Sequence, residues 1–130
     1  MKIVYDLMEK DTPKKVSNYI RKLWKEDKID ELLLLIDIDK NFNCGLDKIP
    51  EFEDAVHSDT KYSFKDFFTL VEKLKQNISD EDKHKLIEES ALECDEIDWN
   101  LIYRKALTHD LHSVINIPAI VETLKKLTKG

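Results

Sequence analysis

The chain has 130 residues, of which 37% are charged, and a formal net charge of −6 with an isoelectric point of about 5.2. This length suits a single domain with a real hydrophobic core. Two glycines and three prolines leave few residues for tight hairpin turns, which disfavours β-sandwiches and glycine-rich phosphate-binding folds. The longest apolar run, Leu32 to Ile36, is far shorter than the ~20 residues that cross a bilayer, and the N-terminus does not resemble a signal peptide. We therefore expect a cytoplasmic protein.

Helical periodicity is clear at three places along the chain. Thr12 followed by Pro13 is typical of a helix start, and Ser63 is a second capping residue. Apolar residues then recur with helical spacing in three stretches, namely Val16, Tyr19, Ile20, Leu23 and Trp24; Phe64, Phe67, Phe68, Val71 and Leu74; and Ile117, Ile120, Val121, Leu124 and Leu127. Each stretch predicts an amphipathic helix with one face in the core.

Further helices are predicted between these three. Residues 29–37 are apolar on every side, as in a central helix, and Leu46, Ile49, Phe52 and Val56 form a shorter amphipathic set. Ser79 and Asp98 are predicted N-caps. The sequence thus predicts a single compact all-α domain of about seven helices, with Ile29, Leu32, Leu33, Ile36, Phe67, Val71, Ile102, Ile120 and Leu124 in its core.

An internal duplication is a further hypothesis. The stretch beginning at Asp27 aligns with the one beginning at Asp95, and Ile49-Pro50 aligns with Ile117-Pro118 at the same offset. A repeat over residues 12–57 and 80–125 predicts a short αα-repeat stack, whereas chance alignment leaves an ordinary helical bundle.

Charge is unevenly distributed along the chain. Residues 1–28 carry a net charge of +3, residues 29–98 carry −12 and residues 99–130 carry +3. Nine carboxylates lie between Ser79 and Asp98, against only Lys83 and Lys85. A segment of this kind favours a cationic partner.

The candidate partner-binding residues lie at the end of the helix predicted after Ser79. They are Glu88, Glu89, Glu93, Asp95, Glu96 and Asp98, with Trp99 as the candidate aromatic anchor. Carboxylates crowded at a helix C-terminus repel one another and oppose the helix dipole, and a cationic partner relieves both effects. The alternative is a solvated acidic face, with Trp99 in the core.

A six-residue stretch, Arg104 to His109, resembles the Arg-x4-His motif of HEPN-type ribonucleases, which are also small helical proteins. The resemblance implies that His109 is a general base on a 2′-hydroxyl and that Arg104 stabilises phosphate charge. Lys105 replaces the polar residue usual after the arginine. A helix end with His109 near the dipole explains the same residues, and we prefer that interpretation.

Metal and cofactor motifs are weak or missing. Asp37, Asp39, Asn41 and Asn43 alternate as in a calcium loop, but Gly45 and Pro50 then fall at the wrong loop positions. The four histidines lack zinc-ligand spacing, Cys44 and Cys94 form no CxxC pair, and no nucleotide-binding motif is present. We therefore expect no catalytic residues, no metal and no cofactor.

The favoured function is protein binding through the acidic surface. By analogy of size, charge and helicity with small bacterial immunity proteins, we expect an inhibitor that neutralises a basic protein such as a nuclease toxin. The low isoelectric point and the presence of only two arginines argue against nucleic acid as a direct ligand. The alternatives are a HEPN-like metal-independent ribonuclease and a helical adaptor or phage-type regulatory protein.

Overall fold

The computed structural model describes residues 2–46, 49, 51 and 62–129. Most of these residues are helical and none lies in a strand, so the predicted all-α fold is confirmed. The α-helices are α1 (Lys2–Met8), α2 (Pro13–Lys25), α3 (Asp30–Asn41), α4 (Phe64–Leu74), α5 (Asp80–Glu93), α6 (Glu96–Asp98), α7 (Arg104–Leu107) and α8 (Ile117–Lys129). A π-helical turn (Trp99–Tyr103) joins α6 to α7, and a 3-10 turn (Leu111–Ser113) lies between α7 and α8.

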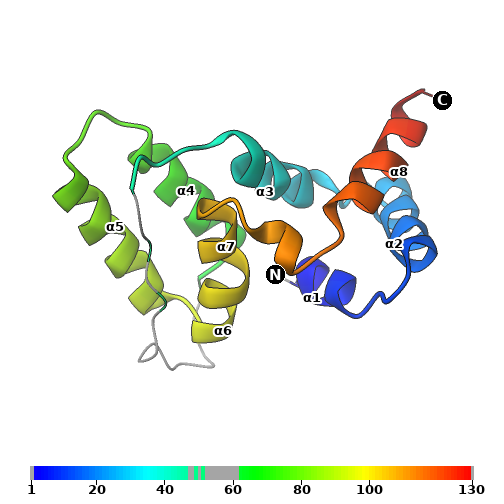
Figure 1. Cartoon of the computed structure of the whole chain (residues 1–130), viewed down its shortest axis with the longest axis horizontal. Coiled ribbons are helices and arrows are strands. Elements are labelled where there is room, and N and C mark those ends of the chain that lie inside the picture. The colour runs from blue at the N-terminus through cyan, green and yellow to red at the C-terminus, as the bar shows by residue number, and fades with distance from the viewer. Residues whose placement is uncertain (1, 47–48, 50, 52–61, 130) are drawn as a thin grey trace.

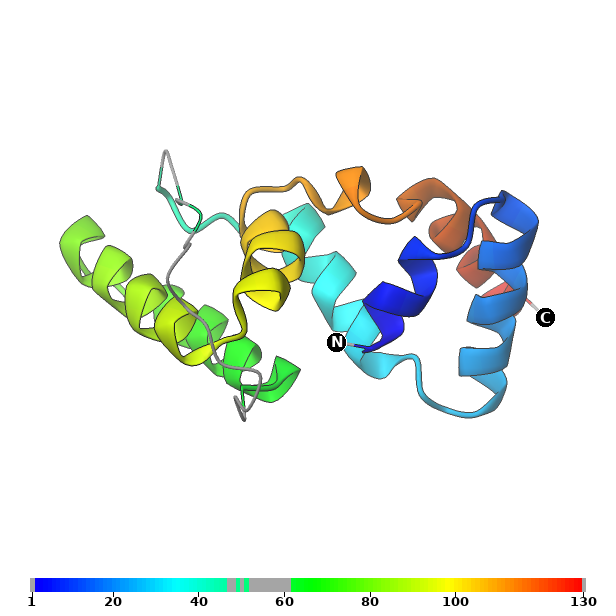
Figure 2. The same ribbon diagram turned by 90° about the horizontal axis from the view of Figure 1, so that it is seen from below.

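The helices form an elongated domain with two distinct ends. Helices α4 and α5 lie together at one end, while α2 and α8 pack against each other at the other end (Figures 1 and 2). Helix α3 and the segment from α6 to α7 lie between them, and α3 packs directly on α7. The two most basic helices and the most acidic helix are therefore far apart.

The core is centred on large side chains from several helices. The rings of Phe67 and Tyr103 lie 4.6 Å apart, and both side chains, like that of Trp99, are buried in one continuous apolar cluster. Seven of the nine predicted core residues are buried: Ile29, Leu32, Ile36, Phe67, Val71, Ile102 and Ile120. The other two, Leu33 and Leu124, are only partly buried.

Two exposed side chains depart from the predicted pattern. The sequence predicts that α3 is packed by other helices on every side, but one side of it faces solvent. Leu34 is 42% exposed, whereas Leu35 is fully buried. Trp24, expected in the apolar stripe of α2, is 38% exposed. Its position at the edge of that stripe places it at the surface, so the core-facing side of α2 consists of Val16, Ile20 and Leu23.

The predicted caps are confirmed at three helices, Ser63 at the start of α4 among them, and wrong at a fourth. The Thr12 hydroxyl accepts a hydrogen bond from Lys15 N at 3.2 Å, and the Ser79 hydroxyl accepts one from Asp82 N at 3.1 Å. Asp98 does not cap the next helix. Asp95 does so, because its Oδ1 accepts from Ile97 N at 2.9 Å, and the helix therefore begins three residues earlier than predicted.

Part of the sequence-based interpretation lies outside the described residues. Leu46 and Ile49 are described and are not helical, whereas Phe52 and Val56 fall among residues that the structure does not describe. The duplication over residues 12–57 and 80–125 extends into the same segment, so it stays a prediction. Helix α2 does correspond to α5 at the proposed offset of 68 residues.

The described part of the chain has no helix long and apolar enough to span a membrane. Cys44 and Cys94 are both buried and not disulfide-bonded. Burial, reinforced by the nearby carboxylates of Asp98 and Asp95, raises the pKa of the Cys94 thiol to about 12. Cys94 is therefore a protonated packing residue at neutral pH.

Candidate partner-binding surface

Helix α5 carries most of the nine carboxylates that lie between Ser79 and Asp98. Its buried residues are Ile87 and Ala91, so the opposite side of the helix carries the carboxylates into solvent. Six acidic residues and two lysines belong to this helix. Lys83 is engaged internally, since its ammonium donates to the Cys44 carbonyl at 2.8 Å. The surface of α5 therefore stays strongly negative.

A groove runs between α5 and its neighbour α4. Three of its lining residues are acidic: Asp66 from α4, and Glu89 and Glu93 from α5. Its volume is about 180 Å³, and its other lining side chains include those of Tyr62 and Lys73. We call this feature the acidic groove. Carboxylates on both walls create a negative potential in a partly enclosed space, which strengthens attraction for a cation.

The structure divides the six predicted acidic residues into two groups. Glu88, Glu89 and Glu93 are exposed on α5, and Glu96 is half-buried. Asp95 is occupied in capping α6, and Asp98 accepts a hydrogen bond from the Tyr5 hydroxyl. Only part of the predicted cluster is thus directed at solvent, while Asp95 serves the start of α6 and Asp98 joins α6 to α1.

Trp99 lies in the core and not at the surface. Its side chain is fully buried at the start of the π-helical turn, so it is not available as an aromatic anchor for a partner. The residue stabilises the centre of the fold instead. We therefore leave it out of the binding surface.

Asp66 is a component of the groove that sequence reasoning missed. Its carboxylate accepts from Ser63 N at 2.8 Å, which is the back-bond of a capping box. The Ser-x-x-Asp spacing could have identified that role, but nothing in the sequence relates Asp66 to Glu89. Only the packing of α4 on α5 brings them to the same groove.

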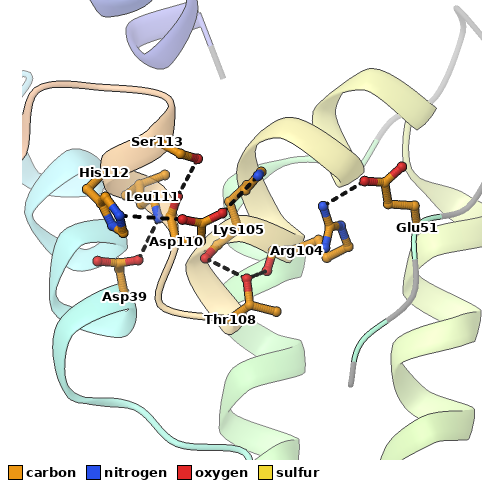
Figure 3. Close-up of polar contacts among 9 residues, drawn as sticks. All are labelled: Asp39, Glu51, Arg104, Lys105, Thr108, Asp110, Leu111, His112 and Ser113. Atoms are coloured by element: carbon orange, nitrogen blue, oxygen red, sulfur yellow. Dashed lines mark hydrogen bonds and ion pairs between the residues drawn. The ribbon is translucent and has the colours of Figure 1, made fainter. Parts of the chain in front are cut away.

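The structure gives Arg104 and His109 separate partners. The Arg104 guanidinium pairs with Glu51 at 3.0 Å (Figure 3), while the His109 ring contacts the Asp39 carbonyl. His109 has a positive φ of 61° just after α7, as in a helix-terminating residue. These contacts give both residues roles in joining α7 to neighbouring segments, and they do not aim the two side chains at a common point.

The aspartates of the candidate calcium loop also serve as structural hydrogen-bond acceptors. Asp39 Oδ1 accepts from Leu111 N at 2.9 Å, which holds the turn after α7 against α3 (Figure 3). Asp37 accepts from Asn41 within α3, and Asn43 accepts from Gly45 N. Within the described residues, no group of three or more His, Cys, Asp or Glu side chains could hold a metal ion.

A second small network stabilises the same turn. Lys105 Nζ lies 2.9 Å from Asp110 Oδ2, and the Ser113 hydroxyl donates to the Asp110 carbonyl at 2.8 Å (Figure 3). The hydrogen bond from Lys105 lowers the pKa of the Asp110 carboxyl. These contacts order the connection between α7 and α8, which in turn determines where α8 lies.

Comparison with known proteins gives information on the fold alone. The chain matches no family model and no curated protein. Among solved structures it is similar to one named Pmar-Lig_PreS3, with a TM-score of 0.77 and 23% sequence identity. The match covers 98% of this chain and 30% of that chain. This chain therefore spans about a third of the length of the protein it resembles, and the likeness shows that the two share a fold.

Proposed function

We propose that this protein is a binding module whose acidic groove takes a cationic segment of a basic protein. The observation that carries the proposal is the placement of Asp66, Glu89 and Glu93 around one groove between two helices. A protruding arginine or lysine of the partner is the natural occupant. Arginine fits best, because its planar fork can donate to two carboxylates at once.

The electrostatics of α5 support fast association with such a partner. Glu88 and the acidic first turn of the helix extend the negative surface beyond the groove. Opposite charges on two proteins accelerate their encounter, and salt weakens this effect as the Debye length falls from ~30 Å at 0.01 M to ~8 Å at 0.15 M.

The concrete form we favour is an inhibitor of the immunity type acting in the cytoplasm. By covering the basic cleft of a nuclease toxin, an acidic helix would exclude the phosphate backbone of the substrate. The presence of the same fold inside the longer Pmar-Lig_PreS3 chain is also compatible with a module that works beside other domains. In either setting, the binding element is the same groove.

The first test uses nona-arginine as a probe and two matched double variants. Glu89→Gln with Glu93→Gln removes two carboxylates from the groove, whereas Glu9→Gln with Glu26→Gln removes two exposed carboxylates elsewhere on the chain. Both change the net charge equally. At ~0.5–1 kcal/mol for each partly exposed pair, we expect about tenfold weaker binding, measured by titration calorimetry, for the groove variant alone.

Equal weakening in the two double variants would mean that the probe responds to net charge only, and the proposal would fail. The same pair of variants then serves to recognise the natural partner. A protein captured from the native host at low salt should be lost with the groove variant and retained with the control.

A further inference from the structure

The fold joins two basic segments that are about a hundred residues apart in the sequence. Helix α2 carries five cationic residues and no acidic one, and α8 carries three lysines and one glutamate. Together they hold eight cationic residues against one acid, a net charge of +7 on two helices of a protein whose overall charge is −6. These helices lie at the end of the molecule opposite α5 (Figure 1).

Specific packing fixes the two helices side by side. Thr123, a buried polar residue of α8, is hydrogen-bonded through its hydroxyl to the Ser17 hydroxyl of α2 at 3.0 Å. Val16 and Ile20 of α2 and Ile120 of α8 are buried in the same core. The cationic side chains are consequently held on one rigid support and not on separate mobile arms.

Three of the five cationic residues of α2 form a regular row with one asparagine. Lys14, Asn18, Arg21 and Lys25 are spaced at i, i+4, i+7 and i+11, which places them along one side of the helix, and all four are exposed. The row spans about 16 Å at 1.5 Å per residue. Lys125, Lys126 and Lys129 are exposed on the neighbouring helix. We call these seven residues the basic face.

Little of this positive charge is neutralised within the protein. Among the ion pairs of the described residues, those that involve α2 or α8 are Lys15 with Asp11 and Lys126 with Glu122, both exposed. Glu26 and Asp27 follow α2 and bound the basic face at its end. Arg21 and Lys25 are therefore available to an external anion.

Trp24 adds an aromatic group to this surface. It lies on α2 one turn from Arg21 and is 38% exposed, although the helical pattern alone predicts that it is buried. A partly exposed tryptophan among cationic side chains is well suited to contact a sugar or an unstacked base.

We propose that the basic face binds the phosphodiester backbone of nucleic acid. A straight row of long, flexible cations matches an evenly charged linear polyanion, and an asparagine within the row offers a further hydrogen-bond donor to phosphate. A membrane surface is a poorer match, because the exposed side of α2 carries Trp24 and no row of large aliphatic residues.

The low isoelectric point does not oppose this inference. It averages over the whole chain, whereas phosphates respond to the local potential, which the separation of the two ends keeps positive. The acidic end repels the same polyanion, so nucleic acid should approach the protein only from its basic end. Because the contacts are made to phosphate, binding is expected to be indifferent to base sequence.

The test measures the binding of fluorescently labelled 20-base-pair DNA duplexes and 20-nucleotide single strands by anisotropy as salt is raised. Wild-type protein is compared with the triple variant Lys14→Gln, Arg21→Gln, Lys25→Gln. The control is Lys65→Gln, Lys73→Gln, Lys75→Gln, which removes the same charge from exposed positions on and just after α4. All replaced side chains are exposed, and circular dichroism verifies that both variants fold.

We expect the slope of log K against log salt to fall by up to about 0.9 for each lost contact with duplex in the α2 variant, and to stay unchanged in the control. Preference for duplex or single strand identifies which form of the backbone is bound. Equal loss in both triple variants would overturn the proposal. So would binding to phosphatidylserine vesicles but not to either nucleic acid, or salt-sensitive self-association without nucleic-acid binding, which would identify a second copy as the occupant.

Discussion

Two tyrosines fasten the N-terminal helices to carboxylates. The Tyr5 hydroxyl donates to Asp98 across 93 residues of sequence, and the Tyr19 hydroxyl donates to Asp6 Oδ2 at 2.7 Å. Burial and the adjacent carboxylate raise the pKa of Tyr5 above its ordinary value, and the same causes act on Tyr19. Asp98 therefore connects the acidic segment to α1, and for this reason its carboxylate is not part of the partner-binding surface.

Tyr5→Phe tests this connection. The variant leaves the half-buried Asp98 carboxylate without its donor from α1, so we expect the free energy of unfolding to fall by ~1–2 kcal/mol at pH 7. Because the folded-state pKa of Tyr5 is raised, the stability it contributes is present below its unfolded pKa of about 10 and is lost as the pH rises further. The difference between variant and wild type in urea titrations should shrink above pH 10. A constant difference up to pH 12 would contradict this account.

The sequence identifies which residues are charged, but it does not show which of them are occupied by hydrogen bonds within the fold. Asp95 and Asp98 are adjacent to Glu93 and Glu96 in the sequence and look equivalent there. Their roles differ because Asp95 lies at a helix start, and because α1 brings Tyr5 to Asp98. Trp99 is likewise ambiguous in sequence, since both a core and an interface favour tryptophan. Tertiary packing decides each case.

For the helices, the apolar periodicity of the sequence predicts where a helix forms better than it predicts which side of the helix faces the core. Helices α2, α4 and α8 occur where their stripes predict them. In α3 the apolar residues cover more of the circumference than the core can contact, so the sequence does not reveal that Leu35 faces inward and Leu34 outward. The π-helical turn at Trp99–Tyr103 was not predicted either, because nothing in its composition distinguishes it from α-helix.

Leu35→Ala and Leu34→Ala form a matched pair on α3. Both replacements put alanine into the same helix, so their effects on helix propensity are alike. Leu35 is fully buried, and its truncation should cost ~2–5 kcal/mol through lost burial and a cavity. Leu34 is 42% exposed, and its truncation should cost less than about 1 kcal/mol. Urea unfolding of both variants checks the assignment, and similar losses would show that the facing of α3 is wrong.

Across the whole molecule, the arrangement of charge depends on the fold as well as on the sequence. The sequence shows two positive segments flanking a negative one. It does not show that α2 and α8 are neighbours, since that follows from contacts such as Thr123 with Ser17. It also does not show that α4 brings Asp66 to α5. The result is a molecule with a positive end, at α2 and α8, and a negative end, at α5; Figure 1 shows these helices at opposite ends of the fold.

This polarity predicts chromatographic behaviour that net charge alone forbids. A protein of net charge −6 with evenly distributed charge should pass through a cation exchanger at pH 7. Concentration of +7 on α2 and α8 should instead cause retention at low salt, because the basic end can contact the matrix while α5 lies at the opposite end of the molecule, and little salt is present to weaken the attraction. The same protein should also bind an anion exchanger through α5.

Lys14→Gln with Arg21→Gln and Lys25→Gln should abolish retention on the cation exchanger, whereas Lys65→Gln with Lys73→Gln and Lys75→Gln should preserve it. Passage of the wild-type protein through the column at 0.01 M salt would mean that its charges do not act as two separate ends.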